Sequence, residues 1–313
     1  MSMKTGSEAT LSSDVAENGR SRERRLQLVA VAGLSAYLLL THATMGLRAE
    51  HAVLAGVGFV LTAVGGKALG FFGLFVPVVL TGISYDYFRL AVPLRGDIHV
   101  ADIYQAELAL FGIDGVVPAL WFEAHTHWAV DLVTGLSYVL YLYVPIGVAI
   151  ALYFVDRERM LAVGLAFLLT NLLGMVVYLA FPAAPPWYVE QYGLGPANLD
   201  ALPSAAGTVR FDRLLGVDYF QTFYARSANV FGAVPSLHVA YPASTAMVLR
   251  AMGKRWWLPV AAFTAVVAFA AVYLQHHYIL DLVAGLACAG GGYLLAKRAV
   301  EALRRPRQEL VDA

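Results

Sequence analysis

The sequence predicts an all-α fold, a multi-pass transmembrane helical bundle. Hydrophobic residues make up 59% of the 313 residues and charged residues only 14%, which is far too apolar for a soluble domain of this length. Segments of about 20 apolar residues, the length that crosses a bilayer, recur along almost the whole chain. The formal net charge is zero, so the charge gives no support to a nucleic-acid partner.

We predict about eight spans. The apolar stretch that begins at Leu26 ends at Arg48 without a small-residue cleavage site, so we interpret it as an uncleaved first span and not as a signal peptide. The polar residues 1–25 are expected to be disordered. The predicted spans are residues 26–47, 52–67, 70–92, 129–154, 159–181, 233–252, 256–275 and 278–298.

Basic residues predict the orientation of these spans. The side that holds the N-terminus collects the arginine cluster at 20–25 and most of the other Lys and Arg residues. The opposite side holds only Arg48, Arg89, Arg95, Arg210, Arg213 and Arg226. By the positive-inside rule, both termini are cytoplasmic and the long loops 93–128 and 182–232 lie outside. His238, where one span begins, and His277, where the last span begins, then share the outer membrane level.

His277 and Asp281 form the centre of the candidate site. If the chain is helical from about residue 278, the two side chains share one helix face, and the carboxylate can orient the imidazole. An imidazole activated in this way can attack phosphorus and form a phosphohistidine. An unpaired carboxylate inside a membrane costs on the order of 2.5–3.5 kcal/mol, which favours a partnered or functional Asp281. The alternative is a structural His–Asp pair that fixes the rotation of the helix.

His238 lies in the first turn of another predicted helix, where Ser236 can serve as the N-cap. Free backbone N–H groups and the helix dipole at such an N-terminus bind phosphate readily. A histidine in that turn can donate a proton to a phosphate oxygen or a leaving group; alternatively, it is an ordinary interfacial residue. His276 is a further candidate for substrate binding, and the other interpretation is that it only faces the headgroups.

A zinc site is the rival chemical interpretation of these side chains. His238, His276, His277 and Asp281 are ligand types that zinc accepts. However, adjacent residues on a helix point about 100° apart, which disfavours joint ligation by the two neighbouring histidines. We therefore predict no metal and no cofactor.

Two motifs carry a family resemblance. Pro235-Ser236-Leu237-His238, followed by His277-Tyr278-Ile279-Leu280-Asp281, resembles the second and third signature motifs of the type 2 phosphatidic acid phosphatase superfamily. Residues 181–188 and 232–238 and the doubled histidine at 276–277 are similar to the fungal inositol phosphorylceramide synthase branch of that superfamily. Residues 84–89 and 99–110 resemble this branch as well, so the resemblance covers roughly residues 70–298.

The resemblance implies a metal-independent phosphoryl or phosphodiester transfer. In it, His277 is the nucleophile, Asp281 orients His277, and His238 is the general acid and base. It also implies a six-helix catalytic core at residues 70–298. Two extra spans at 26–69 and the disordered N-terminus at 1–25 would precede this core, and a cytoplasmic tail at 299–313 would follow it.

The sequence departs from the phosphatase members in its cations. Those members usually carry an arginine six residues before the nucleophilic histidine, where this chain has Ala271, and their first motif, a Lys followed by Arg-Pro, is missing. The phosphate must therefore find cations elsewhere. Arg89, at the outer end of its span, and Arg226, just before the His238 helix, are the candidates; each is equally interpreted as an anchoring interfacial arginine.

These observations predict an enzyme of the cell membrane with its active site on the extracytoplasmic side. It would take a phospho-headgroup from a phospholipid or lipid phosphate and pass it to a lipid hydroxyl or to water. The missing arginine and the Ala-Pro-Pro-Trp-Tyr loop favour transfer to a lipid hydroxyl. A lipid phosphate phosphatase acting on phosphatidic acid or isoprenoid phosphate is the second interpretation. A non-enzymatic transporter is the third, and the absence of an inverted repeat disfavours it.

Overall fold

A computed structural model describes the backbone of residues 5–309 and the side chains of residues 17–304. The described chain is helical, with isolated bridges as its only strand-like pairs. The longer helices are α1 (Thr5–Met45), α2 (Ala49–Val64), α3 (Gly66–Tyr87), α6 (Trp128–Val155), α7 (Arg157–Ala180), α11 (Leu237–Leu249), α12 (Lys254–Tyr273) and α13 (Ile279–Glu309). The short ones are η1 (Phe88–Leu90), η2 (Val92–Leu94), α4 (Ala101–Phe111), α5 (Pro118–Glu123), α8 (Pro186–Tyr192), η3 (Ala206–Thr208), α9 (Val209–Leu215), α10 (Tyr219–Tyr224) and η4 (Arg250–Met252).

The structure corrects the number of spans. Within the described residues, six helices are long and apolar enough to cross a membrane, namely α1, α3, α6, α7, α12 and α13. The prediction of eight was wrong because α2 and α11 are too short. At about 1.5 Å per residue, the 16 residues of α2 and the 13 of α11 fall short of a hydrocarbon core about 30 Å thick. The chain is a multi-pass membrane protein with six candidate spans, and its expected orientation stays a prediction.

The apolar character of α11 comes from burial inside the protein. Of its 13 residues, 11 are buried, and a helix that is apolar on every face is one that is covered on every face. Hydropathy does not distinguish protein neighbours from lipid, so the sequence predicted a span at residues 233–252 where the structure has a short central helix. At the other end of the chain, residues 5–25 form the first part of α1, although we expected residues 1–25 to be disordered; residues 1–4 lie outside the described backbone.

Contacts divide the chain into two compact units, one up to Val76 and the other from Pro77 onward. In the first unit, α1 and α2 pack against each other as a helical hairpin. A Cβ on Gly58 would lie 2.9 Å from Leu34, so this glycine permits the close approach of the two helices. Gln27 donates from its side-chain amide to the Thr62 carbonyl at 3.0 Å, which ties the hairpin near its open end.

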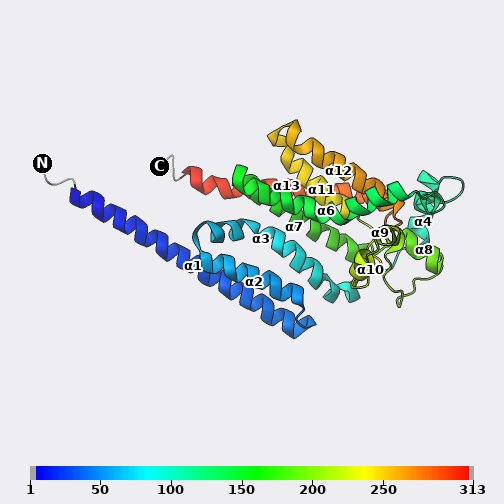
Figure 1. Ribbon diagram of the computed structural model, residues 1–313, viewed down its shortest axis with the longest axis horizontal. Helices are drawn as coiled ribbons and strands as arrows, with labels where there is room; N and C mark the ends of the chain where they lie inside the picture. The colour runs from blue at the N-terminus through cyan, green and yellow to red at the C-terminus, as the bar shows by residue number, and fades with distance from the viewer. Residues whose placement is uncertain (1–4, 310–313) are drawn as a thin grey trace. The chain divides into compact units, whose positions relative to one another are not determined.

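The second unit contains the bundle that carries the candidate site. Helices α6, α7, α11, α12 and α13 pack around one another, and the second half of α3 lies against α7. Figure 1 shows these helices running side by side, with the short helices α4, α8, α9 and α10 gathered at one end of the bundle. Gly292 of α13 lets that helix approach α7, because a Cβ there would lie 2.1 Å from Thr170 Oγ1.

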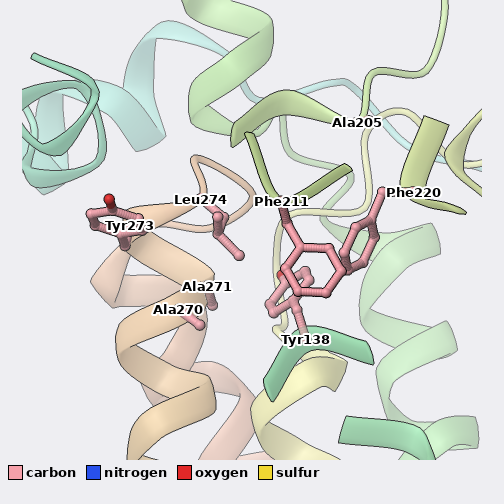
Figure 2. Close-up of a cluster of buried hydrophobic side chains, with 8 residues drawn as sticks. All are labelled: Tyr138, Ala205, Phe211, Phe220, Ala270, Ala271, Tyr273 and Leu274. Carbon is pink, nitrogen blue, oxygen red and sulfur yellow. The ribbon is translucent and has the colours of Figure 1, made fainter. Parts of the chain in front are cut away.

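Two features close the end of the bundle where the short helices gather. Isolated bridges join His99 to Ala183 and Ala183 to Gly232, so three loop segments run side by side. Next to them lies a buried cluster contributed by α6, α9, α10 and the end of α12. Figure 2 shows the rings of Tyr138, Phe211 and Phe220 packed together in this cluster. The bridges and the buried cluster hold the loops at this end of the bundle in place.

Candidate active site

His277 lies in the tight turn between α12 and α13. The turn is folded back onto α12, because the Ala271 carbonyl accepts the N–H groups of both His276 (3.1 Å) and His277 (3.0 Å). Gln275 takes a positive φ of 63°, which reverses the chain direction before α13 begins at Ile279. His277 therefore lies just before α13, which begins within one residue of the expected start at 278, and the fixed turn sets the direction of its ring.

The ring of His277 is held from one side by two acceptors. Its Nδ1–H donates to the Ala233 carbonyl at 2.9 Å and to Asp281 Oδ2 at 3.3 Å. Asp281 is fully buried, and its Oδ2 also accepts the Tyr278 N–H at 2.7 Å. With its proton on Nδ1, the imidazole carries its lone pair on Nε2. That is the form a nucleophilic histidine requires.

His238 approaches this lone pair directly. Its Nδ1 lies 3.0 Å from His277 Nε2, so the structure brings His238, His277 and Asp281 into one hydrogen-bonded series. His238 is half-buried, and its ring lies between two tyrosines of α6. The ring centroids are 4.2 Å from Tyr138 and 4.3 Å from Tyr141. These contacts restrict the movement of the imidazole while leaving its edge toward His277 open.

Ser236 is the N-cap of α11 and joins the segment that holds His238 to the segment that holds His277 and Asp281. Its N–H donates to the Asp281 carbonyl at 2.9 Å, and its Oγ is buried without a partner among the described residues. A Cβ on Gly285 would lie 2.4 Å from the Ser236 carbonyl oxygen, so only glycine lets α13 come this close. An orphaned hydroxyl beside the free N–H groups of a helix start is a favourable place for an anion.

His276 turns away from His277 toward the loop that contains Ala205. Its Nε2–H donates to the Ala205 carbonyl at 3.2 Å, and its ring stacks on Tyr224 with centroids 4.5 Å apart. Burial, with the neighbouring His277 as a smaller cause, lowers the pKa of His276 from 6.5 to about 3. A neutral imidazole with its N–H already engaged supplies no positive charge to a phosphate.

The lowered pKa of His276 predicts a pH-dependent loss of stability. Below pH 6.5 the unfolded chain takes up a proton at this residue and the folded chain does not, so stability should fall as the pH drops toward 3. The contribution is about 1.4 kcal/mol per pH unit over that window. Thermal unfolding in detergent at pH 7 and pH 4.5 should show a smaller decrease for His276→Gln than for wild type. Equal decreases in the two proteins would contradict this assignment.

The two arginines that were candidates for phosphate binding have other surroundings than the histidines do. Arg89 pairs with Asp86 at 2.9 Å at the end of α3, and Arg226 is exposed just after α10. Neither of them lines the cavity that His238 and His277 line. Their roles in binding substrate stay predictions.

Glu107 supports the start of α13, just after His277, and was not singled out by the sequence. Its fully buried carboxylate accepts the N–H groups of Ile279 (2.8 Å) and Leu280 (3.1 Å). It therefore caps the first turn of α13 from α4, which is distant in the chain. Burial raises its pKa above the ordinary value. The only sign in the sequence was an acidic residue beside the apolar run 108–111.

Arg210 is the second residue that sequence reasoning missed. Its guanidinium donates to Asp131 Oδ1 and Glu123 Oε2, both at 2.7 Å, and to the Tyr273 carbonyl at 3.2 Å. Tyr273 also donates its hydroxyl to Asp131 at 3.0 Å. This network joins α5, α6, α9 and the end of α12 beside the turn that holds His277. Sequence position alone had placed Arg210 only among the outer charges.

A cavity of about 310 Å³ opens onto the histidines. Its walls come from α3, α6, α7 and α11 and are mostly apolar or aromatic, including Val78, Tyr85, Tyr141, Phe167 and Tyr241. An apolar cavity with a few convergent polar groups is typical of a ligand site. In the described part of the chain, no three His, Cys, Asp or Glu side chains are grouped so as to hold a metal ion.

The chain is similar in sequence to known proteins of one family. The family profile described as PAP2 superfamily matches residues 102–295, more than half of the chain. "Phosphoinositol dihydroceramide synthase" of Bacteroides thetaiotaomicron is 39% identical over 284 residues, covering 88% of this chain and 92% of that protein. "Inositol phosphorylceramide synthase" of Candida albicans is 39% identical over 142 residues, 44% of this chain and 29% of that protein. The corresponding catalytic subunit of Saccharomyces cerevisiae is 38% identical over 115 residues, 37% of this chain and 29% of that protein.

No solved structure matches the chain significantly. The matched region holds both histidine segments, Glu107 of α4 and most of the bundle that surrounds the cavity. The extent of these matches shows that the chain belongs to the PAP2 superfamily and is a multi-pass membrane enzyme of that family.

Proposed function

We propose that this enzyme transfers a phosphoinositol headgroup from a phospholipid donor to the hydroxyl of a ceramide-type lipid, through a phosphohistidine at His277. The observation that carries the proposal is the paired geometry of the histidines. His277 presents an unprotonated Nε2 at the edge of an apolar cavity, 3.0 Å from His238 Nδ1. The similarity over 88% of the chain to a phosphoinositol dihydroceramide synthase supports this choice of donor and acceptor.

In the first step, His277 Nε2 attacks the phosphorus of the donor. The bond between phosphorus and the glyceride oxygen breaks, and His238, which enters this step as the imidazolium, gives its Nε2 proton to that oxygen and becomes neutral, so diacylglycerol leaves. Nδ1–H of His277 stays on the Ala233 carbonyl and Asp281. The buried carboxylate then neutralises the positive charge that develops on the phosphorylated imidazole.

In the second step, the direction of proton transfer reverses. The acceptor hydroxyl gives its proton to His238, its oxygen attacks phosphorus, and the N–P bond to His277 breaks. The products are the headgroup-bearing acceptor and an enzyme with its original protonation. One histidine therefore acts as acid and then as base, while the other carries the group.

The surroundings of the histidines support binding of a lipid phosphate. The N-terminus of α11, where the Ser236 hydroxyl is unpartnered, lies two residues before His238, and its free N–H groups can donate to phosphate oxygens. Arg226 and Arg89 are our proposed cations for the headgroup, outside the apolar cavity. The walls between α3, α6, α7 and α11 offer an apolar surface for the acyl or long-chain-base part of a lipid.

The direct test is turnover by the purified enzyme in mixed micelles. Headgroup-labelled phosphatidylinositol with a fluorescent dihydroceramide should give a labelled, fluorescent product, and the rate should be unchanged in EDTA. Phosphatidylcholine in place of phosphatidylinositol should give at most a small fraction of that rate. Release of inorganic phosphate from phosphatidic acid or an isoprenoid phosphate, without a lipid product from added ceramide, would instead establish a phosphatase. An absence of turnover on all these lipids would favour the transporter.

A further inference from the structure

We infer that the aromatic wall around His238, and Tyr224 of α10 above all, determines whether the phosphohistidine reacts with a lipid hydroxyl or with water. The inference rests on the proposed function, because it concerns the second half of that reaction. A transferase that passes through a covalent intermediate must keep water from the base that activates the acceptor. The structure places tyrosine side chains where they would do so.

The wall encloses His238 on three sides. Tyr138 stacks on the imidazole with planes 13° apart and Tyr141 packs against it from a second direction. The Tyr224 hydroxyl lies 3.5 Å from Nε2, the nitrogen that does not face His277. Tyr224 thus covers Nε2 of His238, the nitrogen that would take the proton from an attacking water.

Tyr224 is held in this place by two independent contacts. Its ring stacks on His276 with planes 18° apart, and α10 is fixed at its start by Asp212. That buried carboxylate accepts the N–H groups of Phe220 at 2.9 Å and Gln221 at 3.1 Å. A short helix capped by a buried acid and clamped by a stacked ring is a stable cover over the site.

Tyr224 also separates two cavities. A second cavity of about 220 Å³ lies between α6 and α10, next to the one that contains the histidines. Both are lined by Tyr141, Leu142, Phe223 and Tyr224, so these four side chains form the partition between them. The second cavity has room for several waters at about 30 Å³ each. Truncating Tyr224 would join this space to Nε2 of His238.

The competing reaction is hydrolysis of the phosphohistidine by water. A water that reaches His238 gives it a proton, its oxygen attacks phosphorus, and the N–P bond to His277 breaks. The product is the free headgroup phosphate monoester in place of a headgroup-bearing lipid. The ratio of this soluble product to the lipid product measures how well water is excluded.

The test compares this ratio in Tyr224→Ala, Tyr224→Phe and Tyr219→Ala, with headgroup-labelled phosphatidylinositol and dihydroceramide in mixed micelles. Tyr224→Ala should raise the ratio of hydrolysis to transfer about tenfold or more, which corresponds to about 1.4 kcal/mol of lost discrimination. Tyr224→Phe should keep the wild-type ratio, because the ring excludes water. Tyr219→Ala is the matched control: it lies on the same helix and lines only the second cavity.

Several outcomes would overturn the inference. An unchanged ratio of hydrolysis to transfer in an active Tyr224→Ala enzyme would do so. An equally raised ratio in Tyr224→Phe and Tyr224→Ala would also do so, since the hydroxyl and not the ring would then exclude water. If Tyr224→Ala fails to fold, Leu142→Ala opens the same partition without touching His238, and its ratio must rise. Failure of the proposed function is distinguishable, because wild type would then form no lipid product at all.

Discussion

His277→Gln should lower turnover about 10⁴-fold or more, because glutamine has no nucleophilic nitrogen to accept the phosphoryl group. The structure argues for a complete loss and not a partial one. The ring is the only side chain in the described site that offers an unprotonated nitrogen supported from behind by both Ala233 and a buried carboxylate. Gln also keeps a side-chain amide near these partners, so the fold should be little affected.

The measurement is product formation by purified His277→Gln on every lipid that wild type uses. His125→Gln is the matched control, because His125 is an exposed histidine at the same end of the bundle, stacked on Trp121. Equal melting temperatures for the two variants would separate loss of chemistry from loss of fold. Turnover of His277→Gln within tenfold of wild type would exclude His277 as the nucleophile.

Arg210→Met should destabilise the folded protein by about 3–5 kcal/mol, because removing one member of a buried ion pair leaves the other charge uncompensated. Asp131 is almost fully buried, and Arg210 is its only cationic partner among the described side chains. Methionine retains most of the aliphatic volume, so the expected loss comes from charge and hydrogen bonds and not from a cavity. The Tyr273 carbonyl also loses its donor, so the start of the turn that holds His277 should loosen and activity should fall as well.

This expectation is checked by denaturant-induced unfolding in mixed micelles at neutral pH. Arg213→Met provides the control, since Arg213 is exposed on the same helix α9. A double variant, Arg210→Met with Asp131→Asn, should recover part of the lost stability because no buried charge is then left alone. Equal stability of Arg210→Met and Arg213→Met would show that the network contributes little.

The parts of the site that could be predicted from the sequence are those set by local spacing. His277 and Asp281 are four residues apart, and Ser236 and His238 mark a helix start, so short-range geometry already indicates that these pairs lie close together. The number of spans could not be predicted, because an apolar run such as residues 237–249 has the same composition whether lipid or protein surrounds it.

The parts of the site that could not be predicted depend on partners that are distant in the sequence. Glu107 reaches α13 across 172 residues of chain, and Arg210 pairs with carboxylates 79 and 87 residues away. No periodicity in a single sequence encodes such pairings, since they depend on how the helices pack. The contacts of Tyr138 and Tyr141 with His238 could not be predicted for the same reason, because tyrosines in an apolar helix are indistinguishable in sequence from ordinary core residues.

The capping of α13 by Glu107 also bears on how the protein is made. The carboxylate belongs to a segment synthesised early, and the N–H groups that it accepts belong to the last span, 172 residues later. Closing a loop of that length comes after local helix formation. If His277 is the nucleophile that we propose, the centre is incomplete until α13 has docked against α4, so a chain that has not yet formed this contact should be unable to attack a lipid.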